Sequence, residues 1–242
     1  MTDERLSVVH EALRTLNSAL AVYAANPAAR ALVQAIPFLG GILDAFAGTA
    51  GSNVAFSRLQ QFAEELNVAI ERSAQRQDPA IGEEDLHDAA IRALHGAVET
   101  GNREKRQTLA AALVGATSVD RPGELDLESV MASLVNLTPA DLSFAASLAN
   151  RERQAKIDRL NRAATEYVGP PPDSFPPPTD AGPDRMFYLA RLQAAGLLES
   201  VVLPATPEVR INRRTEPAIE FRFTPTFHRI LELLRAGGQD IG

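Results

Sequence analysis

The chain has 242 residues, a net charge of −7 at pH 7 and no cysteine. Without cysteine there can be no disulfide framework, thiolate nucleophile or cysteine-ligated metal. The content of 45% hydrophobic and 23% charged residues is that of an ordinary soluble protein. Aromatic residues are only 5% and tryptophan is absent. Alanine and leucine must therefore fill the core, which favours closely packed helices and a mainly α fold.

Residues 1–120 are predicted to form a helical bundle that begins with two helices. Apolar residues recur at helical spacing over residues 4–25. Asn26-Pro27 then places a capping residue before a proline that suits the first turn of a new helix.

Residues 31–56 are the most apolar stretch of the bundle and contain several glycines. A membrane-spanning helix needs about 20 mainly apolar residues, and Gln34, Pro37, Asp44 and Asn53 interrupt this run. Two interpretations stay open: a buried central helix, or a segment that contacts a membrane or a protein partner. In the second, the contact residues are the large apolar ones, namely Ile36, Phe38, Leu39, Ile42, Leu43 and Phe46.

The rest of the bundle is predicted from helical periodicity and capping residues. Residues 57–77 form an amphipathic helix, and further helices are expected at residues 83–100 and 103–116. Asn102 is expected to cap the last of these. The buried positions are Leu59, Phe62, Leu66 and Ile70 in the first helix and Leu109, Ala112, Leu113 and Ala116 in the last.

Residues 121–168 are predicted to be linking helices, and residues 169–183 a proline-rich loop. Thr138-Pro139 with Asp141 is a typical helix start, with a cap, a first-turn proline and a first-turn acid. That helix is expected to reach about residue 153, and a charged helix continues toward residue 167. The loop holds two proline triplets, which cannot be helical because proline lacks the backbone donor.

Residues 184–236 have the order of a winged-helix-like α+β module. A helix over residues 184–195 ends at Gly196, which suits a helix C-cap. An extended segment follows, and then a small β-hairpin whose strands are residues 209–211 and 219–223. A final helix is entered through Thr224-Pro225.

This module carries eight arginines against six acidic residues between positions 184 and 235. Arginine suits phosphate contact, so one interpretation is a DNA-binding transcriptional regulator. Its contact residues, from the helix and the wing, are Arg185, Tyr188, Arg191, Arg210, Arg213 and Arg214. The remainder of the chain is acidic, which disfavours non-specific binding to nucleic acid. A module that binds protein instead is the other interpretation.

Catalytic and cofactor motifs are not found in the sequence. The nucleophile-elbow, P-loop and dinucleotide patterns are all missing. His87 and His95, on one predicted helix, would lie about 12 Å apart, too far to share one metal ion. We therefore expect no catalytic residues, no metal site, no cofactor and no small-molecule substrate.

Several short sequence segments, taken together, resemble those of a known group of proteins. They are Ile36-Pro37 with Gly40-Gly41, Glu104-Lys105-Arg106, Leu137-Thr138-Pro139-Ala140-Asp141, Gly196-Leu197-Leu198 and Phe221-Arg222-Phe223-Thr224. In this order the chain resembles bacterial helical proteins with a winged-helix-like C-terminus, of the abortive infection protein alpha type. The resemblance implies a role in bacterial defence against phage and brings no catalytic residues with it.

The sequence thus predicts a non-enzymatic defence or protein-interaction protein, with the DNA-binding regulator as the alternative. A protein partner or a second copy of the chain is the expected ligand, and the 31–56 segment adds a membrane as a candidate. The polar, acidic start at residues 1–5 is unlike a signal peptide. We therefore expect a cytoplasmic protein, with peripheral membrane contact if that segment is used.

Overall fold

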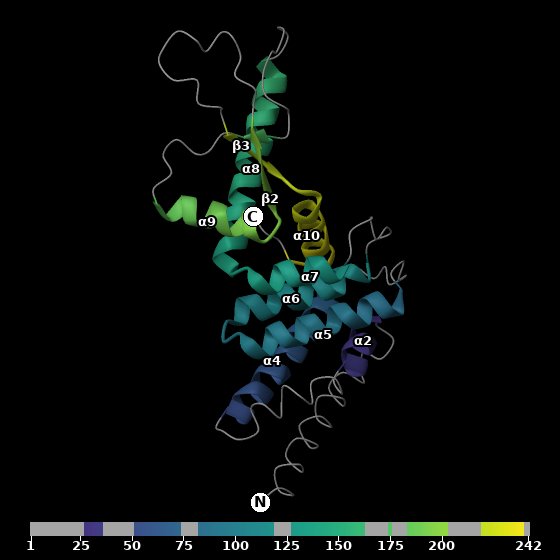
Figure 1. Ribbon diagram of the computed structural model, residues 1–242. Helices are drawn as coiled ribbons and strands as arrows, with labels where there is room; N and C mark the ends of the chain where they lie inside the picture. The colour runs from purple at the N-terminus through teal and green to yellow at the C-terminus, as the bar shows by residue number, and fades with distance from the viewer. Residues whose placement is uncertain are drawn as a thin grey trace, which may run out of the picture. The chain divides into compact units, whose positions relative to one another are not determined.

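The computed structural model describes residues 27–35, 51–73, 82–118, 127–162, 174–175, 183–202 and 219–239 (Figure 1). Within these ranges it contains eight helices and one three-stranded antiparallel sheet. The predicted fold class, mainly α with a small antiparallel sheet near the C-terminus, is therefore confirmed. The chain divides into two compact units: residues 1–139 with 229–241, here called the first unit, and residues 140–228, the second unit.

The first unit is a bundle arranged around one buried helix. Every residue of helix α6 from Thr108 to Ala116 is buried, and α4, α5 and α7 lie beside it (Figure 1). The sequence predicted one buried stripe on this helix, but its whole circumference is covered because neighbours contact it on several sides. The described helices are α2 (Pro27–Ala35), α4 (Gly51–Arg72), α5 (Glu83–Glu99), α6 (Arg103–Ala116), α7 (Leu127–Asn136) and the part of α10 (Pro225–Ala236) from Arg229 onward.

Several helices begin at the residues that the capping residues and prolines in the sequence predicted. Helix α2 begins at Pro27, as predicted. The Asn102 side chain accepts a hydrogen bond from the Lys105 amide at 3.2 Å, which confirms Asn102 as the cap of α6. Helix α4 begins at Gly51, earlier than predicted, and its four predicted core residues from Leu59 to Ile70 are at most 8% exposed.

Two glycines allow α6 and the end of α10 to approach each other at backbone distance. A Cβ atom at Gly115 would fall on the carbonyl oxygen of Leu233, and one at Gly237 would fall on the carbonyl oxygen of Ala111. No larger residue fits at either position without moving a helix. The Gln239 side chain then donates to Thr108 Oγ1 at 3.3 Å, so the chain beyond α10 is also held against α6.

The second unit combines two helices with the sheet. Its elements are α8 (Pro139–Arg162), β1 (Ser174–Phe175), α9 (Pro183–Ala194), β2 (Leu198–Val202) and β3 (Ile219–Phe223). Helix α8 begins at Pro139, as predicted, but continues without a break to Arg162, where two helices were expected. The strand order is β1-β3-β2.

Strand β1 was not predicted, because it lies between two proline triplets. Phe175 is paired with Phe221, and Ser174 with Arg222. Strand β2 pairs with the other edge of β3, from Leu198 opposite Phe223 to Val202 opposite Ile219. The expected hairpin strand at residues 209–211 and its turn lie outside the described residues.

The turn between α9 and β2 contains a glycine with a positive φ and is stabilised by hydrogen bonds from Thr224. Gly196 has φ +72°, the left-handed conformation expected at this C-cap. The Thr224 hydroxyl donates to the Gly196 carbonyl at 2.6 Å, and its amide donates to Leu197 at 3.0 Å. The rings of Phe223 and Phe227 stack at 4.1 Å between centroids. These contacts fix the end of α9 against the start of α10.

In the parts of the chain that the structure describes, no helix is both long and apolar enough to cross a membrane. The six residues singled out for membrane or partner contact, from Ile36 to Phe46, lie outside those parts.

Candidate interaction surface on helix α9

The buried side of α9 holds the helix against its own unit. Leu189 is 1% exposed and Leu192 is fully buried, and Leu197 in the following turn is also fully buried. The Leu197 amide donates to the Leu192 carbonyl at 2.9 Å, which closes the helix C-terminus. Helical spacing in the sequence groups these three leucines with Met186 and Ala190, but only the leucines are buried, and they form the anchored face of the helix.

The outward side of α9 is apolar as well. Met186 is 49% exposed and Phe187 is 58% exposed, although both are large hydrophobic residues. Because successive residues of a helix are turned by about 100°, the exposed side chains form one continuous arc. Its members are Met186, Phe187, Ala190, Gln193 and Ala194, and none of them is charged. We call this set the α9 face.

Two residues predicted to contact DNA, Tyr188 and Arg191, are in contact with α8. The Tyr188 ring stacks on Phe144 of α8, with centroids 5.1 Å apart and planes 27° apart. Arg191 Nη2 lies 2.8 Å from Asp141 Oδ2, and the Arg191 guanidinium lies 5.5 Å from the centre of the Phe187 ring. Both side chains are half-buried. They attach α9 to α8 and flank the α9 face.

Asp141 is the residue that makes this arrangement stable. It was predicted as a first-turn acid of α8, and its side chain is fully buried in contact with Arg191. A buried carboxylate is strongly unfavourable unless it is paired. Arg191 is therefore committed to an ion pair within the second unit.

The remaining predicted contact residues are only partly described. Arg185 lies in the first turn of α9, but its side chain is outside the described set, as are Arg210, Arg213 and Arg214 altogether. Arg222 of β3 is also paired, since its Nε lies 2.6 Å from Glu199 Oε1 across the β2–β3 pair. The structure therefore brings together Tyr188 and Arg191 of the predicted set, in contact with α8.

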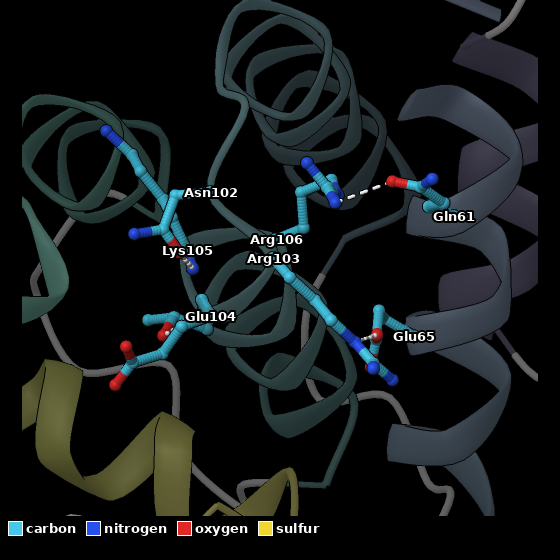
Figure 2. A network of polar contacts seen from close by, with 8 residues as sticks. Gln61, Glu65, Asn102, Arg103, Glu104, Lys105 and Arg106 are labelled. Atoms are coloured by element: carbon cyan, nitrogen blue, oxygen red, sulfur yellow. Dashed lines mark hydrogen bonds and ion pairs between the residues drawn. The ribbon is translucent and has the colours of Figure 1, made fainter. Parts of the chain in front are cut away.

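The first unit contains a separate polar network between α4 and α6, shown in Figure 2. Arg103 Nε donates to Glu65 Oε1 at 2.7 Å, and Arg106 Nη2 donates to Gln61 Oε1 at 2.6 Å. The same Arg106 guanidinium donates to the Thr100 carbonyl at 3.0 Å. Arg58 donates to the carbonyls of Val98 and Glu99.

Arg58 and Arg106 donate to carbonyls at the C-terminal end of α5, where the helix dipole is negative, whereas Arg103 pairs with Glu65 of α4. Burial lowers the pKa of Arg106 from its usual value, and the neighbouring Arg58 lowers it further. The hydrogen bond from Arg103 to Glu65 raises the pKa of Arg103. Both residues stay charged at neutral pH, and each has its guanidinium bound to a neighbour. The network is therefore a structural clamp between helices α4, α5 and α6.

A groove of about 450 Å³ lies between α5 and α7 in the same unit. Ile91, Ala132 and Val135 form its apolar part, and the Arg92–Glu128 ion pair crosses it. His95 and Asp88 also line it but are two helical turns apart. Across the described residues, no group of three side chains is placed to hold a metal ion.

Phe187 is the residue that the sequence analysis missed. The signal was present: with Leu189 and Leu192 on one side of the helix, Phe187 and Ala194 fall on the other. A helix that is apolar on two sides must be covered on both or must expose one of them.

Comparison of the chain with protein-family models, with curated proteins and with solved structures gave no match.

Proposed function

We propose that this is a non-enzymatic interaction protein that binds a protein partner through the α9 face. The observation that carries the proposal is the exposure of Met186 and Phe187 on a helix whose other side is already anchored. Single exposed apolar side chains are common on protein surfaces, whereas contiguous groups of them mark interaction sites. The arc has no charge that would have to be desolvated on binding.

The residue types of the surface support a protein ligand. Aromatic residues, methionine and arginine are enriched at protein interfaces, whereas lysine and acidic residues are depleted. Phe187, Met186 and the flanking Arg191 fit this composition. Because each apolar side chain is about half exposed, covering both completely would contribute on the order of 1–2 kcal/mol each.

A DNA-binding role has less support from the described residues. The base-reading side of a recognition helix needs polar or basic side chains that reach into the major groove. On α9, the side chains of Tyr188 and Arg191 contact α8, and the residues of the α9 face are uncharged. We therefore expect no electrophoretic retardation of random duplex DNA at low salt.

The proposal is tested by photo-crosslinking in cells that express the protein. A photoreactive amino acid replaces Phe187 in one variant and Ser143, an exposed residue of α8 in the same unit, in the matched control. We expect the variant at position 187 to give one discrete adduct with a protein, and the control to give none. The mass of the adduct identifies the partner class.

Equal labelling from both positions, or adducts only from position 143, would overturn the proposal. Salt-sensitive binding of duplex DNA that Arg213→Ala and Arg214→Ala together abolish would overturn it in favour of the DNA-binding alternative. The resemblance to proteins of the abortive infection protein alpha type implies a role in bacterial defence. In that role, Phe187→Asp is expected to remove any protection against phage that the wild-type protein gives.

A further inference from the structure

The groove between α5 and α7 has the size and the apolar surface of a site for a small molecule. Its volume of about 450 Å³ falls within the range of pockets that hold small organic ligands. Ile91 of α5 and Ala132 and Val135 of α7 line it, and each of them is partly exposed. A compact apolar group in the groove would cover all three side chains and remove their surface from water.

Polar side chains lie on either side of Ile91 along α5. Asp88 and His95 both line the groove, and seven residues of helix place them about 10 Å apart. The His95 ring is half-buried, and no hydrogen bond joins it to another residue in the described part of the chain. Because a neutral imidazole offers one donor and one acceptor, His95 is able to bind a polar group of a molecule in the groove.

The charge of the lining determines the kind of molecule that fits. Arg92 is paired with Glu128 across the groove, so their charges cancel. Asp88 carries the unbalanced negative charge, and among the described side chains its carboxylate makes one polar contact, with the adjacent His87 at 3.4 Å. The first unit as a whole holds thirteen basic and twenty acidic residues. The groove therefore attracts a cation and repels an anion.

From these features we infer that the groove binds a small organic amine with an apolar body. The ammonium group lies at Asp88, the apolar body covers Ile91 and the α7 side chains opposite, and a polar atom at the far end bonds to His95. The amine is held as a ligand, and no bond is made or broken. All lining residues belong to the first unit, so the site is separate from the α9 face and goes beyond the proposed function.

The absence of tryptophan from the chain allows a direct test. Tryptamine is the probe, because its indole fluorescence is measured against a protein that contains no indole. Titration with the purified full-length protein is expected to change the emission of tryptamine in a saturable manner. Indole-3-acetate and indole-3-ethanol are the matched probes, since they carry the same ring but a carboxylate or a hydroxyl in place of the ammonium group. Tryptamine should bind at least about tenfold more tightly than either, equivalent to roughly 1.4 kcal/mol.

Two pairs of variants locate the site on the protein. Asp88→Asn removes the unbalanced charge of the lining and should weaken tryptamine binding about tenfold, whereas Glu64→Gln, at an exposed acid of α4 outside the groove, should change it by less than about twofold. Ala132→Phe fills the groove and should abolish binding, whereas Ser129→Phe, at an exposed position of α7 outside the lining, should leave it intact. Circular dichroism checks that each variant is folded.

Several results would overturn the inference. They are an unchanged tryptamine emission with the wild-type protein, equal affinity for the three probes, tighter binding of indole-3-acetate, and equal losses from Asp88→Asn and Glu64→Gln. A folded Ala132→Phe variant that binds tryptamine as the wild type does would overturn it too. These measurements use purified protein alone, so their failure leaves the photo-crosslinking result at position 187 and the proposed function unaffected.

Discussion

Replacing Gly115 by alanine tests the closest helix contact in the first unit. The new Cβ would fall on the Leu233 carbonyl oxygen, with the Leu233 Cα at 3.0 Å and its carbonyl carbon at 2.7 Å. Because these atoms are backbone, no change of rotamer relieves the overlap. The ends of α6 and α10 must move apart, and the buried leucines between them lose contact.

The magnitude follows from the required displacement. Carbon atoms in ordinary contact lie about 3.5–4.0 Å apart, so the helices must separate by on the order of 1 Å. Overpacking of this kind costs about 1–3 kcal/mol, and a rigid backbone obstacle places Gly115→Ala near the upper limit, about 3 kcal/mol. In a chain of this length that corresponds to a melting temperature lower by roughly 6–12 °C, measured by circular dichroism.

Two other glycines provide matched controls. A Cβ at Gly101 would have only Arg58 Nη2 within 4 Å, at 3.5 Å, so Gly101→Ala should leave stability unchanged or raise it by up to about 1 kcal/mol. Gly196 has open space but a φ of +72°, so Gly196→Ala should cost about 1–2 kcal/mol through backbone strain alone. If Gly115→Ala melts together with Gly101→Ala, α6 and α10 do not touch at this point and the packing described here is wrong.

Three further substitutions test other contacts by urea unfolding. Asn102→Ala removes the cap of α6 and should lower the free energy of unfolding by about 1 kcal/mol; no loss would mean that the cap is not formed. Asp141→Ala leaves Arg191 without its buried partner, and because Arg191 retains some solvent contact we expect a loss of about 2 kcal/mol rather than the full cost of a buried pair. An effect below about 0.5 kcal/mol would refute a structural role for that pair. Arg106→Lys keeps the charge but cannot reach both the Thr100 carbonyl and Gln61, so it should cost about 1 kcal/mol; a silent variant would remove Arg106 from the clamp.

Features set by neighbouring residues were predictable from the sequence. Asn102 caps α6 because a short polar side chain three residues before a free amide does so in any helix. Pro139 begins α8, and Gly196 ends α9, for equally local reasons. The buried positions of α4 follow from helical periodicity, since a helix on the surface of a bundle buries one stripe.

Features that depend on distant residues were not predictable. Asp141 and Arg191 are fifty positions apart, and nothing in either local sequence indicates that they meet. Strand β1 pairs with β3, with Phe175 opposite Phe221, although prolines flank it in the sequence. Exposure of Phe187 is also a tertiary property. The sequence shows a helix with two apolar sides, and only the packing against α8 and the sheet decides which side is covered.

The most direct test of the α9 face is hydroxyl-radical footprinting of its methionine, read by mass spectrometry. Besides Met1, the chain has two methionines, the half-exposed Met186 and the fully buried Met131. We predict that Met186 is oxidised rapidly in dilute purified protein and is protected in cells that express the protein, while Met131 stays unreactive in both. A Met186 as unreactive as Met131 in dilute purified protein, or one that is oxidised equally fast in cells, would contradict an exposed face that a protein partner covers.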